Sequence, residues 1–123
     1  MILVVEDNDF VRMQIVKFLR DGDHEVVEAS NAPDALSQVE KNEDSIQLVL
    51  VDIRMEPEDG FDFLNKLKAK NIAIPAMLVT GDDNPDILAK ASQAGVSGIL
   101  KKPVNKDRLL KMVERAIAGS RHS

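Results

Sequence analysis

The chain has 123 residues, a formal net charge of −5 and no cysteine, with 44% hydrophobic and 30% charged residues. This length suffices for one domain with a hydrophobic core, and the composition is ordinary for a soluble globular protein. The negative charge argues against direct binding to a nucleic-acid backbone, and the lack of cysteine excludes disulfides, thiolate catalysis and zinc–thiolate sites.

The first half of the chain alternates apolar runs with helical patterns. A strand is predicted over Ile2–Val5, followed by the acidic residues 6–9 and a helix that stops at Gly22. Residues 25–29 predict a short strand whose charged flanks indicate a sheet edge. Asn31 is the expected N-cap of the next helix. No apolar segment is long enough for a membrane span or a signal peptide, so a cytoplasmic location is expected.

The most informative stretch covers residues 46–52. Its four consecutive aliphatic residues, 48–51, leave no polar face, which indicates a strand covered on both sides. The strand ends at Asp52 and is followed by a charged loop over residues 53–60. In open α/β sheets, ligands bind at the carboxyl ends of strands. The alternative interpretation is that Asp52 only caps the next helix.

The second half continues the alternation. A helix is predicted up to Asn71, then a buried strand over residues 74–79 that ends at Thr80. Asn84 and the proline after it open a helix that stops at Gly95.

A last strand is predicted over residues 97–100, just before Lys102, and Asn105 is the expected cap of a final helix. We expect one domain over residues 1–118 and a tail or linker remnant over residues 119–123. Five strands that alternate with five helices predict an α/β fold with a parallel sheet and right-handed crossovers. An edge position for the second strand fits the doubly wound, flavodoxin-like (βα)5 arrangement with strand order 2-1-3-4-5.

Five polar residues stand at the carboxyl ends of these strands: Glu6, Asp7, Asp52, Thr80 and Lys102. Because neighbouring strands lie about 4.8 Å apart, these side chains can converge on one cleft. Three carboxylates together need a cation, and oxygen ligands suit Mg²⁺. A carboxylate beside a cation can attack phosphorus, with a lysine and a hydroxyl to stabilise the phosphoryl oxygens. Taken singly, each residue is also compatible with a helix-end charge, a turn residue or a solvated lysine.

The motifs together identify a family. The chain resembles response-regulator receiver domains of two-component signalling over nearly its whole length, through residues 4–8, residues 51–55, Gly60, Thr80-Gly81 and Lys102-Pro103.

The resemblance implies a signalling switch in a phosphorelay. Asp52 would accept a phosphoryl group from a histidine kinase or a histidine phosphotransfer protein. Activity would be limited to self-phosphorylation and autodephosphorylation. The fourth helix, fifth strand and fifth helix would form the face for an output domain or effector protein. Phosphorylation-dependent homodimers are compatible with the family, whereas membrane contact and direct nucleic-acid binding by this domain are not expected.

The resemblance also implies a magnesium site. Asp7, Asp52 and the backbone carbonyl of Arg54 would bind Mg²⁺ directly, and Glu6 would act through a metal-bound water. Arg54 and Asp82 would flank the mouth of the site and tune the lifetime of the phosphoryl group.

Thr80 would be the switch hydroxyl and Lys102 the phosphate-binding ammonium, with a cis peptide bond before Pro103. The sequence departs from the family at Ile99, where an aromatic residue is usual, and at Glu56, where proline is frequent. The path of the loop after Asp52 and the form of the switch are therefore open.

Three alternative functions fit the sequence less well. A phosphohydrolase with an Asp nucleophile would need a general acid two residues after Asp52, where Arg54 stands. A flavodoxin-like nucleotide-binding domain would need a glycine-rich loop after the first strand, which the sequence lacks. A receiver-like scaffold without chemistry would not need the complete set of acids, Thr80 and Lys102.

Overall fold

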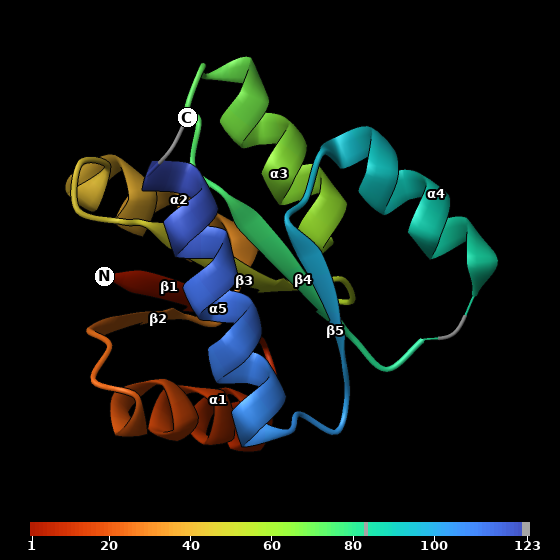
Figure 1. Cartoon of the computed structure of the whole chain (residues 1–123). Coiled ribbons are helices and arrows are strands. Elements are labelled where there is room, and N and C mark those ends of the chain that lie inside the picture. The colour runs from red at the N-terminus through yellow and green to blue at the C-terminus, as the bar shows by residue number, and fades with distance from the viewer. Residues whose placement is uncertain (83, 122–123) are drawn as a thin grey trace.

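A five-stranded sheet with helices on both faces makes up the computed structural model, which describes residues 1–82 and 84–121 (Figure 1). The strands are β1 (Ile2–Val5), β2 (Val26–Ala29), β3 (Leu48–Asp52), β4 (Ala76–Thr80) and β5 (Gly98–Lys101). The helices are α1 (Asp9–Asp21), α2 (Ala32–Asn42), α3 (Gly60–Ala69), α4 (Pro85–Ala94) and α5 (Lys106–Arg121).

The sheet is entirely parallel, in the order β2-β1-β3-β4-β5. The predicted strand order and fold class are therefore confirmed. Helices α1 and α5 cover one face, and α2, α3 and α4 cover the other (Figure 1). The crossovers from β1 and β3 thus leave toward opposite faces, which is the arrangement that opens a crevice at the carboxyl edge of a doubly wound sheet.

Two hydrophobic cores sandwich the sheet because side chains alternate along each strand. In β1, Ile2 and Val4 pack toward α1 and α5, whereas Leu3 and Val5 pack toward the helices of the other face. Every residue of β1, β3 and β4 is buried. The continuous apolar runs therefore mark central strands, and the half-buried β2 lies at an edge, as predicted.

The helices that follow β1 and β3 are capped by other residues than the acids at the ends of these strands. Asn8 caps α1 by accepting a hydrogen bond from the Val11 N–H at 3.0 Å, and Asp59 caps α3 through a capping box. The alternative in which Asp52 caps the following helix is therefore wrong. The caps predicted at Asn31, Asn84 and Asn105 are all present.

The last helix is longer than predicted. Helix α5 continues to Arg121, so the first part of the predicted tail, residues 119–121, is helical. The rest of that tail, residues 122–123, lies outside the described residues. Within the described ranges, no helix combines the length and apolar character needed to cross a membrane.

Candidate functional site

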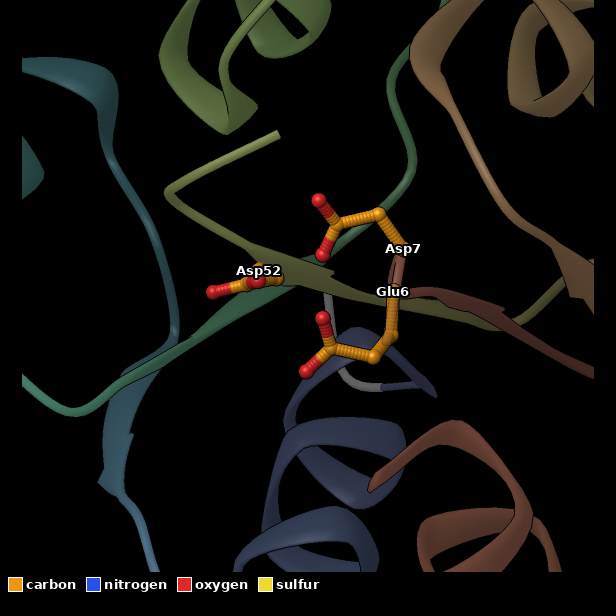
Figure 2. Close-up of side chains that lie close together, drawn as sticks. All are labelled: Glu6, Asp7 and Asp52. Atoms are coloured by element: carbon orange, nitrogen blue, oxygen red, sulfur yellow. The ribbon is translucent and has the colours of Figure 1, made fainter. Parts of the chain in front are cut away.

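Three carboxylates meet at the carboxyl edge of the sheet. Glu6 and Asp7 directly follow β1, and Asp52 is the last residue of the neighbouring strand β3. Val5 pairs with Val51, so the residues that follow them are brought side by side. One carboxylate oxygen from each acid lies within 4.8 Å of the others. Figure 2 shows the Glu6 and Asp7 side chains extending toward Asp52 from the neighbouring strand.

Lys102 supplies the counter-charge from the end of β5. Its Nζ lies 2.6 Å from Glu6 Oε1 and 3.4 Å from Asp52 Oδ2. The backbone N–H of Lys102 donates to the Thr80 carbonyl at 2.8 Å, which ties the lysine to the end of β4. The peptide bond between Lys102 and Pro103 is cis, as predicted. The lysine is thus held across the acidic cluster and contacts Glu6 more closely than Asp52.

The cluster holds more negative than positive charge. Burial raises the pKa of Glu6, which is 1% exposed, and the neighbouring Asp52 raises it further against the opposing effect of Lys102. Burial and then Glu6 raise the pKa of Asp7. Burial lowers the pKa of Lys102, but the Glu6 and Asp52 carboxylates outweigh this effect and hold that pKa above its usual value. One ammonium therefore does not neutralise three carboxylates.

The donor set fits a magnesium ion. All three side chains offer oxygen, and Asp7 is exposed, so water can complete the coordination shell. Within the described residues, the buried Glu6 Oε1 has no aligned hydrogen-bond donor, although it contacts Lys102. Such an oxygen can accept a hydrogen bond from a metal-bound water.

A cavity of about 440 Å³ opens in front of Asp52, and its lining residues are Asp52, Arg54, Thr80, Gly81, Asp82 and Lys102. The Thr80 side chain is buried, and its Oγ1 accepts a hydrogen bond from the Asp82 N–H at 3.0 Å. Because the hydroxyl acts here as an acceptor, its own hydrogen is left to donate to another group. The structure therefore brings Asp52, Thr80 and Lys102 to one cavity.

Arg54 and Asp82 form an ion pair at the mouth of this cavity. The pair joins the loop after β3 to the loop after β4. Asp82 Oδ1 also accepts a hydrogen bond from the Asn84 N–H at 2.9 Å. This bond and then the Arg54 guanidinium hold the pKa of Asp82 below its usual value. The two residues expected to flank the site therefore contact each other.

Two further residues, Arg12 and Gly60, position the site through contacts with the residues at the ends of β1 and β3. Arg12 Nη1 donates to the Glu6 carbonyl at 2.8 Å, and the same guanidinium pairs with Asp9 and Glu28. A Cβ at Gly60 would lie 2.5 Å from the Asp52 carbonyl oxygen, so only glycine fits at this position beneath the end of β3. Gly60 was visible as part of the family motif, but no local signal pointed to Arg12.

The sequence departs from the family pattern at Ile99 and Glu56, and the structure shows the surroundings of both residues. Ile99 lines a small cavity of about 110 Å³ together with Thr80, Ile87 and Leu88. An aliphatic side chain thus lines the same cavity as Thr80. In the loop after Asp52, the bond between Glu56 and Pro57 is cis.

The comparisons with known proteins agree on one family. Residues 2–114 match the model of the response regulator receiver domain. The chain is 36% identical over 122 residues to the transcriptional regulatory protein ZraR of Salmonella typhimurium, covering 99% of this chain and 27% of that protein. It is 34% identical over 116 residues to a cyclic di-GMP phosphodiesterase of Thermotoga maritima, covering 94% of this chain and 30% of that protein. The chain thus spans less than a third of the length of both relatives.

The fold is also found in solved structures. A response regulator receiver domain protein from Clostridium thermocellum superposes with a TM-score of 0.90 at 28% identity, covering 98% of this chain and 95% of that chain.

Proposed function

The chain belongs to the response regulator receiver domain family, whose members act in two-component signalling, and we propose that it is a phosphorylation-controlled switch with Asp52 as the phosphoacceptor. One observation carries this proposal. The Asp52 carboxylate lies at the end of a central strand, 3.4 Å from the Lys102 ammonium and within 4.8 Å of two further carboxylates. This arrangement suits a carboxylate that attacks phosphorus while positive charge stabilises the equatorial phosphoryl oxygens.

The proposed reaction transfers a phosphoryl group from a phosphohistidine. An Asp52 carboxylate oxygen forms a bond to phosphorus, the phosphorus–nitrogen bond breaks, and the electron pair leaves with the imidazole of a histidine kinase or histidine phosphotransfer protein. The product is an acyl phosphate. The Lys102 ammonium and the Thr80 hydroxyl donate to the phosphoryl oxygens, because both groups line the same cavity as Asp52.

A magnesium ion would be held by Asp7, Asp52 and the backbone carbonyl of Arg54, with Glu6 acting through a metal-bound water. When bound, the ion would supply the positive charge that the acidic cluster lacks. The exposed Asp7 and the buried Glu6 support these different roles, because a solvent-facing carboxylate can share a hydrated ion.

The proposal also covers the bounds of the receiver domain and the face through which it would contact its partners. Residues 1–118 would form the receiver, and residues 119–123, which begin within the last turn of α5, would form a tail or linker. An output domain or effector would contact the face formed by α4, β5 and α5, on which a phosphorylation-dependent homodimer could also form. The side chains of Leu88 on α4 and of Ile99 on β5 share a cavity with Thr80, which supports a route from the site to this face.

The test is phosphorylation by acetyl phosphate with Mg²⁺, read by intact mass. We expect one phosphoryl adduct on the parent chain, no adduct in EDTA and none on Asp52→Asn. The control is Asp44→Asn, which removes an exposed carboxylate before the amino end of β3, the end opposite to Asp52, and should be phosphorylated like the parent. An unmodified parent, or an unchanged adduct on Asp52→Asn, would contradict the proposal.

A further inference from the structure

Arg12 holds the backbone at the point where the acidic residues leave β1. Its Nη1 donates to the Glu6 carbonyl at 2.8 Å, and the Glu6 N–H donates to the Ala29 carbonyl at 3.1 Å. The peptide units on both sides of Glu6 are therefore anchored. Arg12 lies in the first turn of α1, where its own N–H donates to the carbonyl of the N-cap Asn8 at 2.9 Å. The guanidinium thus ties the start of α1 to the end of β1.

Two carboxylates hold the same guanidinium in place. Nη2 lies 2.6 Å from Asp9 Oδ1 on α1, and Nε lies 3.3 Å from Glu28 Oε1 on the edge strand β2. The Arg12 side chain is only 17% exposed. Three acceptors in three directions use the planar fork of an arginine, a geometry that the single ammonium of a lysine does not reproduce. Because two carboxylates already share its one positive charge, Arg12 contributes geometry rather than excess positive charge to the acidic cluster.

The acids of the proposed magnesium site depend on this stretch of backbone. Asp7 is exposed and directly follows the Glu6 carbonyl, so the peptide plane that Arg12 holds sets the direction in which the Asp7 side chain leaves the strand. Figure 2 shows the side chains of Glu6 and Asp7 extending toward Asp52 from this short stretch. A rotation of the peptide between Glu6 and Asp7 would separate carboxylate oxygens that now lie within 4.8 Å of one another.

We propose that Arg12 is the positioning residue of the magnesium site: its planar guanidinium fixes the peptide between Glu6 and Asp7, and the affinity for Mg²⁺ depends on this contact. This inference rests on the proposed function. The charge and the geometry of Arg12 predict opposite results. By charge alone, removal of a cation next to the acidic cluster should strengthen the binding of Mg²⁺. Removal of a contact that positions the ligands should weaken it.

The experiment measures the dissociation constant for Mg²⁺ in the parent, Arg12→Met and Arg12→Lys. Amide chemical shifts in two-dimensional NMR spectra are followed as Mg²⁺ is added to the metal-free protein, so the signals report on the folded chain. Met is unbranched and uncharged, whereas Lys keeps the charge and loses the planar fork. Lys17→Met is the matched control, because it removes the same charge from the same helix, where Lys17 pairs with Asp21 at 3.3 Å.

We expect the dissociation constant to rise about tenfold in Arg12→Met, the lower end of the usual effect of an outer-shell partner on metal affinity. Arg12→Lys should also raise it, because a retained charge without the fork cannot hold all three acceptors. Lys17→Met should stay within about twofold of the parent, because the charge of an exposed side chain is screened by salt. Arg12→Lys decides by itself if Arg12→Met gives no folded spectrum.

An unchanged or lower dissociation constant in either Arg12 variant would overturn the inference, even if the variant unfolds at lower urea concentration than the parent. The acetyl phosphate adduct on Asp52 would still support the proposed function in that case. Amide signals of the parent that do not respond to Mg²⁺ would overturn the inference together with the magnesium site of the proposed function.

Discussion

Replacing Asp52 by Asn should stabilise the metal-free protein, because the substitution removes one of three clustered negative charges. At the 4.8 Å limit of their separation, two unit charges repel by about 3.5 kcal/mol at an effective dielectric of 20. The Lys102 ammonium at 3.4 Å offsets this with an attraction of about 5 kcal/mol at the same dielectric. Repulsion from both Glu6 and Asp7 therefore exceeds the attraction by about 2 kcal/mol, and solvent around the exposed Asp7 reduces this figure toward about 1 kcal/mol.

The assay is thermal melting of the parent and Asp52→Asn in EDTA and in excess Mg²⁺. A gain of 1–2 kcal/mol raises the Tm in EDTA by about 4–8 °C for a domain of this size. Mg²⁺ at ten times its dissociation constant should stabilise the parent by about 1.4 kcal/mol through mass action, and Asp52→Asn by less. Asp44→Asn controls for the change in net charge and should melt like the parent.

A lower Tm of Asp52→Asn in EDTA would refute the reasoning. In that case the Lys102 contact would outweigh the repulsion, and the acids would not form a cluster that needs a cation. The case for a magnesium site would weaken with it.

Three further predictions follow from the site and its surroundings. In urea titrations, the free energy of unfolding of the metal-free protein should rise from pH 7 toward mild acid. The folded-state pKa values of Glu6 and Asp7 are raised, so protonation of these carboxylates relieves the cost of keeping them ionised in the folded protein. A free energy of unfolding that only falls would contradict the conclusion that burial raises these pKa values. Gly60→Ala should lose about 1–3 kcal/mol in the same titrations and phosphorylate more slowly, because its Cβ would meet the Asp52 carbonyl oxygen at 2.5 Å. Gly119→Ala, where a Cβ meets no atom within 4 Å, is its control and should be no less stable than the parent. Amide exchange with and without beryllofluoride should change in α4, β5 and α5, and changes confined to α1 and α2 would argue against the proposed output face.

The sequence by itself determined the fold, because the information was local and periodic. Uninterrupted apolar runs such as residues 48–51 can bury both faces only in the middle of a parallel sheet, and the short charged strand could only lie at an edge. Asparagine caps marked the helix starts at Asn31, Asn84 and Asn105. Once the strand order is known, register alone brings Asp52 beside Glu6 and Asp7, so the acidic cluster was predictable as well.

Only the tertiary structure decided how the cluster is held. The Arg12 contact with the Glu6 carbonyl, the packing of Gly60 under Asp52 and the closer approach of Lys102 to Glu6 all depend on loop paths. These contacts join segments that no periodicity relates, and the geometry of loops follows from packing of the whole domain rather than from neighbouring residues. The length of α5 was missed for a related reason: residues 118–121 carry little apolar pattern, yet they continue a helix that is already anchored to the sheet by its earlier turns.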